Sequence, residues 1–465
     1  MDSPAYSSSM DKHGLELTRI WFDDIVREAL DRARQRHHVF WLSETLTIPP
    51  IALSSAFAAA KDFGWLFWRP DGMVQLGLGV SREWQWHHPT HLADMEHQAA
   101  RLRNEGLPPD TWVVGGQAFH ADSPWDGWPT VYLAIPLIQI VQDAEKAIVR
   151  LALPVHPDQA LEAYQRLLEP WWDVLFASTL PHQRISHPQA VASSPGRAEW
   201  LRLVADTVQR LRRGPLDKVV LARSLKLSFT NALPVPLILD NLRSQNPDAT
   251  VFAVQRHGSI FLGASPELLI RVRQNQAETM SLAGSAARGI TPEDDSRLAR
   301  AMIDDPKTQR EHRVVKEHVT QALSRLTHDM MVASAPTLKK LPSVQHLWTP
   351  ITAQLNHDAD IWKIVAKLHP TPAVAGYPVP EAIRYLIAVE PFTRGWYAGS
   401  LGWTSLAGDG EWIVALRSGR LDPHQALLYA GCGIMADSDP ETELAESDWK
   451  FSTMLSALEV DGEKP

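Results

Sequence analysis

The sequence predicts a large α/β protein that is built on a mixed β-sheet with few crossover helices. Short apolar segments punctuated by glycine and proline fill the first half, an amphipathic helix follows them, and a glycine-punctuated strand runs into an acidic helix near the end. With 465 residues and 45% hydrophobic content, the chain can bury a large core. Its length alone would allow two or three domains.

The first half of the chain carries strand-like segments and one expected helix, at residues 92–104. Nothing in this half predicts chemistry, and we interpret the 18 tryptophans of the chain as anchors of the core and of sheet edges. The stretch 178–195 is rich in Ser, Pro, His and Gln without periodicity, so we expect a loop there that could pass for a domain linker. The expected strands are residues 38–43, 64–68, 73–79, 111–115 and 130–135.

An amphipathic helix is expected at residues 197–212, where apolar side chains recur at helical spacing. A turn and an apolar strand follow, and Lys218 stands at the start of that strand. Burial among apolar residues would favour the free amine of Lys218 over its ammonium, which suits a general base. Taken alone, a lysine in this position is more often an edge residue whose ammonium reaches water.

Glu267 follows Pro266 within an apolar segment, residues 260–271. Apolar surroundings raise the pKa of a carboxyl group, so we expect Glu267 to stay protonated and to serve as a general acid. The residues alone leave open the alternative that Glu267 caps a turn at the end of a strand.

Two acidic helices supply candidate metal ligands. Glu443, Glu446 and Lys450 fall at i, i+3 and i+7 and share one helix face, and Glu311 leads a second helix whose following face is apolar. Carboxylates from two helices are a suitable oxygen site for Mg²⁺. The alternative is that acidic residues at a helix start only complement the macrodipole.

Charge and cysteine content narrow the classes of protein. The net charge of −9 and the absence of a basic stripe argue against a nucleic-acid partner, whereas a small anionic substrate needs only a local arginine. The single cysteine, Cys432, excludes an internal disulfide and fits a reducing compartment. No apolar run reaches the ~18 residues of a membrane span, and residues 1–30 are too charged for a signal peptide, so we expect a cytoplasmic protein, or a stromal one if a plastid is involved.

Several motifs, in order, resemble the signature of the chorismate-utilising enzymes. They are Glu311-His312 after a lysine at position 307, the Gly431-Cys432-Gly433 turn, and Glu443-x-x-Glu446 followed by Lys450. The resemblance covers roughly residues 199–458. It implies one α/β domain over residues 1–465, with large mixed or antiparallel sheets packed face to face and helices outside. Residues 1–195 would form its N-terminal sheet portion and residues 196–460 its chorismate-binding catalytic portion.

Within the family, the run Asp-Lys-Val-Val-Leu-Ala-Arg around Lys218 resembles that of isochorismate synthases. The resemblance implies that Lys218 is the general base and Glu267 the general acid, so that water adds at C2 of chorismate while the C4 hydroxyl leaves. It also implies that Glu311 and Glu446 hold Mg²⁺, with Glu443 acting through water.

The resemblance extends to the residues that bind the substrate. Tyr397 and Arg417 match positions that hold the enolpyruvyl carboxylate, and we read Arg417 as lying in the middle of a strand, where an unpaired cation indicates an anionic partner or a buried ion pair. Glycine lets a backbone approach the substrate closely. The full set of substrate-binding candidates is Gly284, Ser285, His369, Ala373, Tyr397, Arg417, Gly431, Gly433 and Lys450.

Three alternatives remain open from the sequence. A salicylate synthase would add pyruvate elimination to the same first step. An amine-incorporating enzyme with a glutaminase subunit is disfavoured, because Lys218 stands where such enzymes carry glutamine and Ala283 stands where others carry a nucleophilic lysine. A silent relative that only binds a ligand would have no reason to keep Lys218, Glu267, Glu311 and Glu446 together. We expect a monomer or weak homodimer. The pathway that uses the product, whether to menaquinone, phylloquinone, siderophores or salicylate, cannot be inferred.

Overall fold

The computed structural model describes residues 12–60, 62–88, 92, 94–122, 125–175, 184–340 and 344–460. Within these ranges the helices are α1 (Lys12–Arg36), α2 (Leu53–Ala59), α3 (Met95–Asn104), α4 (Leu161–Leu175), α5 (Arg197–Arg212), α6 (Val235–Gln245), α7 (Pro292–Asp304), α8 (Pro306–Leu323), α9 (Ile361–Leu368), α10 (Val379–Val389) and α11 (Pro440–Ala457).

The strands of the N-terminal half are β1 (Phe40–Leu42), β2 (Thr45–Ile48), β3 (Phe63–Trp68), β4 (Val74–Trp86), β5 (Trp112–Gln117), β6 (Val131–Gln142), β7 (Ala147–Leu151), β8 (Leu153–Val155) and β9 (Ala190–Ser194). Those of the C-terminal half are β10 (Lys218–Ser228), β11 (Thr250–Arg256), β12 (Ser259–Ser265), β13 (Leu268–Arg273), β14 (Gln276–Ala287), β15 (Thr327–Val332), β16 (Thr337–Lys340), β17 (Val344–Leu355), β18 (Gly376–Tyr377), β19 (Ser400–Ser405), β20 (Gly410–Val414), β21 (Ser418–Asp422) and β22 (Gln425–Ile434).

Strands from the two halves of the chain share one network of backbone hydrogen bonds. β3 pairs with β11, and β5 pairs with β19, so the N-terminal strands continue the sheets of the C-terminal half. Within the described ranges, every pair of hydrogen-bonded strands is antiparallel. The expected α/β class with large antiparallel sheets is therefore confirmed.

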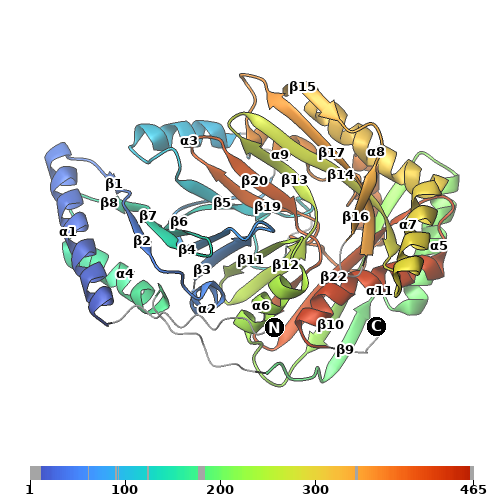
Figure 1. Cartoon of the computed structure of the whole chain (residues 1–465), viewed down its shortest axis with the longest axis horizontal. Coiled ribbons are helices and arrows are strands. Elements are labelled where there is room, and N and C mark those ends of the chain that lie inside the picture. Colours follow the sequence, from blue (N-terminus) through green and yellow to red (C-terminus); the bar gives the residue numbers. More distant parts are fainter. Residues whose placement is uncertain are drawn as a thin grey trace.

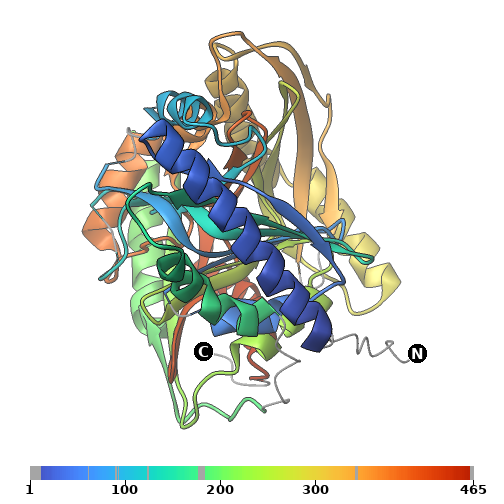
Figure 2. The ribbon, with the colours of Figure 1, turned by 90° about the vertical axis from the view of Figure 1, so that its left-hand side faces the viewer.

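Helices cover the outside of the sheets (Figure 1). In this view α1 and α4 lie on the left, beside the N-terminal strands, and α5, α7, α8 and α11 lie on the right. Figure 2 shows α1 crossing the outer face of the N-terminal strands with α4 beside it, and α1 contacts β1, β8 and α4. Within the described ranges, no helix is both long enough and apolar enough to cross a membrane.

Most elements expected from the sequence are present. The helix at residues 197–212 is α5, with the expected bounds, and the five expected strands lie within or overlap β1, β3, β4, β5 and β6, while the expected helix at 92–104 begins only at Met95. The expected loop at 178–195 is wrong for β9, whose residues pair with β10; residues 178–183 lie outside the described residues. β9 is largely exposed, so it is held by backbone hydrogen bonds and shows no apolar periodicity.

Four elements bring the candidate residues together. β10 and β22 pair along their length, so Lys218 at the start of β10 lies beside the Gly431–Gly433 end of β22. α11 packs on β22, and α8 packs on β14, which carries Gly284 and Ser285. The carboxylates on these two helices therefore face the same strand ends.

Candidate active site

A polar cavity of about 60 Å³ lies where these elements meet. Its walls come from strands, helices and loops that are far apart in the sequence, which is typical of an active site. Ten of the candidate residues line it: Glu267, Gly284, Ser285, Glu311, Ala373, Tyr397, Arg417, Gly431, Gly433 and Lys450.

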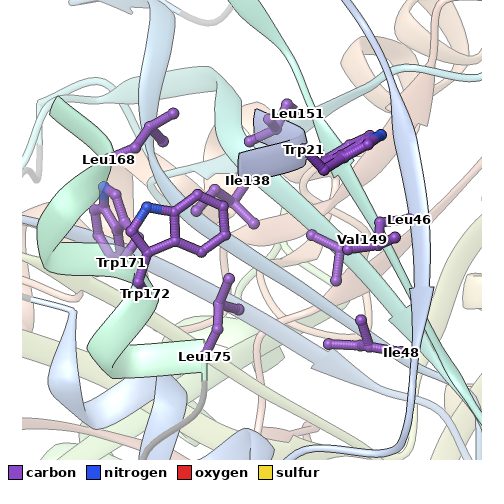
Figure 3. A pocket seen from close by; sticks show the side chains of 10 residues that line it. All are labelled: Trp21, Leu46, Ile48, Ile138, Val149, Leu151, Leu168, Trp171, Trp172 and Leu175. Carbon is purple, nitrogen blue, oxygen red and sulfur yellow. The ribbon is translucent and has the colours of Figure 1, made fainter. Parts of the chain in front are cut away.

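A second hollow lies far from this chemistry, among α1, α4 and strands of the N-terminal half (Figure 3). Trp171 and Trp172 of α4 and Trp21 of α1 line it together with aliphatic side chains such as Leu46 and Ile138. None of its lining residues can ionise, so this hollow has no group for acid–base catalysis.

Lys218 is fully buried directly behind the cavity wall. Its Nζ atom lies 2.9 Å from Glu311 Oε1, so the lysine has a carboxylate partner rather than the purely apolar surroundings that the sequence suggested. A Cβ atom at Gly433 would lie 2.4 Å from Glu311 Oε1 and 2.8 Å from Lys218 Cε. Only glycine at position 433 therefore leaves space for this pair beside the cavity.

Glu267 lies between β12 and β13 and is only 6% exposed. Its backbone is fixed on both sides, because its N–H donates to Ser265 Oγ and its carbonyl accepts from the Val414 N–H. Burial raises the pKa of Glu267 to about 7, although Lys218 and Arg417 act in the opposite direction. This is the direction expected from its apolar sequence context.

The surroundings of position 284, which lies in strand β14, also require a glycine. Gly284 has φ +80°, and a Cβ atom there would lie 2.4 Å from Thr308 Cγ2 on α8. The register of β14 against β17 shifts at this point, between Ala283 and Ser285. This shift is a β-bulge, which bends the strand locally, and Gly284 and Ser285 at the bulge line the cavity.

Arg417 does not lie in the middle of a strand, so that part of the sequence interpretation is wrong. β20 ends at Val414 and β21 begins at Ser418, and Arg417 occupies the connection with φ +51°. A left-handed backbone at a non-glycine residue is costly, and such residues occur in turns and cluster at functional sites. Tyr397 lies nearby, stacked on Tyr429 with ring centroids 5.0 Å apart, and burial raises its pKa to about 12.

Each of the three candidate metal ligands lies beside a different lysine. Glu311 pairs with Lys218, Glu446 Oε1 accepts from Lys450 Nζ at 2.6 Å, and Glu443 Oε1 accepts from Lys307 Nζ at 2.9 Å. Among the described residues, no three His, Cys, Asp or Glu side chains already form a ligand set.

The charges around this cluster nevertheless suit a divalent cation. Burial and the neighbouring Glu446 both raise the pKa of Glu443, so its charged form is disfavoured. Burial would lower the pKa of Lys307, but Glu443, Glu311 and Glu446 outweigh it and raise that pKa. The three carboxylates thus all lie close enough to Lys307 to raise its pKa, and their oxygen atoms are ligands that Mg²⁺ prefers.

His369 is one of four candidates that do not line the cavity, with Lys218, Glu443 and Glu446. It is absent from the lining, and its Nε2 lies 3.2 Å from the carbonyl oxygen of Ala118, after β5. Burial lowers its pKa to about 4, so it is neutral. The sequence motif alone could not reveal this long-range contact with the N-terminal half.

Three functional candidates were missed by the sequence interpretation. His346 and Tyr429 line the cavity, and Lys307 contacts Glu443. Lys307 precedes Glu311 by four residues on α8, and that spacing could have identified it. The other two needed the strand register.

Cys432 is a small packed residue between the two glycines near the end of β22. It is buried, and its Sγ lies 3.4 Å from the carbonyl oxygen of Glu443. Burial, together with Glu443 and Glu446, raises the pKa of its thiol well above the usual value, so it is no nucleophile.

Comparison with known proteins matches residues 28–459 to the family described as "Chorismate binding enzyme". The salicylate biosynthesis isochorismate synthase of Pseudomonas aeruginosa is 34% identical, with 93% of each chain covered. The isochorismate synthase MenF of Bacillus subtilis is 30% identical, covering 93% of this chain and 96% of that one. The solved structure of MenF, the menaquinone-specific isochorismate synthase of Escherichia coli, matches with a TM-score of 0.77 at 28% identity, covering 93% and 99%.

Proposed function

This chain belongs to the chorismate-binding enzyme family, and we propose that it is an isochorismate synthase that interconverts chorismate and isochorismate with Mg²⁺. The observation that carries the proposal is that a candidate acid, Glu267, and a candidate base, Lys218, lie at one cavity. Burial raises the pKa of Glu267 to about 7, so part of it can hold a proton near neutral pH, and Lys218 is a buried base candidate directly behind the wall.

In the forward direction, the Lys218 amine takes a proton from water as the water oxygen bonds to C2 of chorismate. The ring double bonds shift, and the C4–O bond breaks while the Glu267 carboxyl gives its proton to the departing hydroxyl, which leaves as water. Each role is worth about 10²–10⁴ in rate in typical enzymes. Glu311, which pairs with Lys218 in the structure, holds the base beside Gly433.

Glu311 and Glu446 would hold Mg²⁺, with Glu443 acting through water. When bound, the ion would supply positive charge for the ring carboxylate of the substrate. Lys307 and Lys450, which now contact two of these carboxylates, would then have to share them with the ion.

Arg417 and Tyr397 are proposed to hold the enolpyruvyl carboxylate, since a guanidinium and a phenol can donate several hydrogen bonds to it. Gly284, Ser285, Gly431 and Gly433 would bring backbone groups to the ring. Ala373 and Lys450 complete the lining. His369 is proposed to hydrogen-bond near the ring: its Nε2 contacts the carbonyl oxygen of Ala118, and its buried Nδ1 has no hydrogen-bond partner within the described residues.

We further propose a cytoplasmic enzyme that acts without a glutaminase subunit, as a monomer or weak homodimer. Lys218 and Ala283 support the use of water over ammonia, because neither glutamine nor a nucleophilic lysine stands at those positions.

Product analysis tests the proposal. Purified protein incubated with chorismate and Mg²⁺ should give an equilibrium mixture of chorismate and isochorismate, resolved by chromatography, without any need for ammonium. Salicylate as the dominant early product would make the protein a salicylate synthase. Anthranilate formed on addition of ammonium would overturn the role of Lys218, and unchanged chorismate would indicate a protein that only binds it.

A further inference from the structure

His346 is a buried histidine that the reaction described above does not use. It lies on β17, where it stands opposite Ser285 of β14 on one side and Lys339 of β16 on the other. Only 6% of it is exposed, and it lines the cavity. Its place is thus fixed by two strand ladders.

Its two ring nitrogens contact two different parts of the substrate site. Nε2 lies 3.3 Å from Arg417 Nη2. Nδ1 lies 3.0 Å from Ser285 Oγ and 3.3 Å from the carbonyl oxygen of Gly284. The imidazole therefore bridges Arg417, in the connection from β20 to β21, and the Gly284–Ser285 bulge of β14.

The chemistry of these partners fixes the position of the ring proton. A guanidinium can only donate hydrogen bonds, so Nε2 must accept, and the proton resides on Nδ1. Nδ1–H then donates toward the Gly284 carbonyl and the Ser285 oxygen. The Ser285 hydroxyl, which lines the cavity, can then donate its own proton to a different acceptor.

We propose that neutral His346 is a positioning residue. It orients the Arg417 guanidinium, and with it the substrate's enolpyruvyl carboxylate, relative to the Gly284–Ser285 bulge of β14. The proposal rests on the proposed function in taking chorismate as the ligand that Arg417 holds.

A neutral partner suits this task better than a carboxylate. In the described ranges no carboxylate lies within ion-pair distance of Arg417, and its side-chain hydrogen bond goes to His346. The imidazole orients the guanidinium without neutralising it, so the full charge remains for an anionic ligand. Burial, then the positive charges of Arg417, Lys450 and Lys339, hold the pKa of His346 well below its usual value, which keeps the ring neutral.

Four variants separate the contacts of the ring. His346→Gln places an amide oxygen near the Nε2 position and can still accept from Arg417, whereas His346→Asn keeps only a donor near Nδ1. His346→Phe removes both contacts and preserves the ring. His346→Glu would pair with Arg417 and compete with the substrate.

The readout is the Kd for chorismate in the presence of Mg²⁺, measured by calorimetry on the full chain in a Glu267→Gln background, in which chorismate should bind without being converted. His346→Phe and His346→Asn should each raise Kd roughly tenfold, His346→Gln less, and His346→Glu most. His328→Asn, at an exposed histidine of β15, is the control and should bind as the wild type does.

A double-mutant cycle with Arg417→Ala decides whether His346 acts through the arginine. Once Arg417 is removed, His346→Phe should raise Kd little further, because the two effects are coupled. Equal increases in Kd with and without Arg417, or an unchanged Kd in His346→Phe and His346→Asn, would overturn the proposal. A failure of the proposed function is distinguishable, because it would appear in the products of the wild type.

Discussion

Taken together, Lys218 and Glu267 must carry one transferable proton for the reaction to run in either direction. The forward reaction needs the Lys218 amine and the Glu267 carboxyl, and the reverse reaction needs the ammonium and the carboxylate. Both states contain the same number of protons. In the structure Lys218 Nζ forms an ion pair with Glu311 Oε1 at 2.9 Å, so, while that pair persists, protonation of Glu267 below its pKa of about 7 leaves the two groups with one proton too many.

A pH profile tests this shared proton. We expect kcat/KM to rise as the pH rises through about 7 for chorismate and for isochorismate alike, because loss of one proton creates the working state. Initial rates in both directions would be measured across that range. A forward rate that falls through about 7 would mean that only the protonated form of Glu267 matters.

The separate roles predict two inactive variants. Lys218→Ala and Glu267→Gln should each lower kcat by about 10²–10⁴, with chorismate binding largely retained. Lys226→Ala is the matched control, because Lys226 lies on the same strand, β10, but is exposed. Steady-state kinetics with thermal unfolding of each variant would show whether lost activity reflects lost chemistry or lost folding. Near wild-type kcat in either variant would remove that residue from the mechanism.

At the scale of elements, helix faces were predictable and strand register was not. The i, i+3, i+7 spacing placed Glu443, Glu446 and Lys450 on one face of α11, as the structure shows them. His346 faces Ser285 only because β14 pairs with β17, across 61 residues of sequence. Such long-range register is set by packing of the whole sheet and leaves no local pattern.

The same limit explains the error at Arg417. The apolar run of β20 seemed to continue through residue 417, but β20 ends at Val414, and the chain turns with Arg417 in a left-handed conformation. Single residues in that conformation are rarely signalled by sequence unless they are Gly, Asn or Asp. For His369, the contact of its Nε2 with Ala118, in the other half of the chain, likewise leaves no local pattern in the sequence.

The metal site on α8 and α11 gives a prediction at this scale. Glu446→Ala should weaken Mg²⁺ binding and with it Mg²⁺-dependent binding of chorismate, because the ion loses an anionic ligand. Calorimetric titration with Mg²⁺ would measure it directly. Glu441→Ala, in the exposed first turn of the same helix, is the control. Full activity in excess EDTA would rule out the metal site.

For the whole molecule, one buried ion pair joins several parts of the fold around the cavity. Arg394 donates to both oxygens of Glu390 and to the carbonyl oxygens of Val220 on β10 and Val374 in the cavity wall. Glu390 Oε1 in turn accepts from the Ala222 N–H. The strand that carries Lys218 is thereby fixed to the loop that carries Ala373.

Breaking that pair should destabilise the entire protein. Arg394→Ala leaves Glu390 buried without its partner, at a cost of roughly 3–5 kcal/mol in the free energy of unfolding. Thermal and denaturant unfolding would measure the loss. The control, Arg384→Ala, breaks an exposed pair with Glu381 and should change stability by no more than about 1 kcal/mol. Similar stabilities for the two variants would mean that the buried pair does not hold the site together.

The most direct test of the central claim, water addition at C2 with loss of the C4 hydroxyl, is an isotope experiment. Chorismate would be converted by the purified protein with Mg²⁺ in water enriched in oxygen-18, and the isochorismate analysed by mass spectrometry at early times. The account predicts one solvent oxygen at C2 and no retention of the oxygen from C4. Unlabelled isochorismate formed at the same rate would contradict it, because the hydroxyl would then have moved within the substrate and Lys218 would have no water to activate.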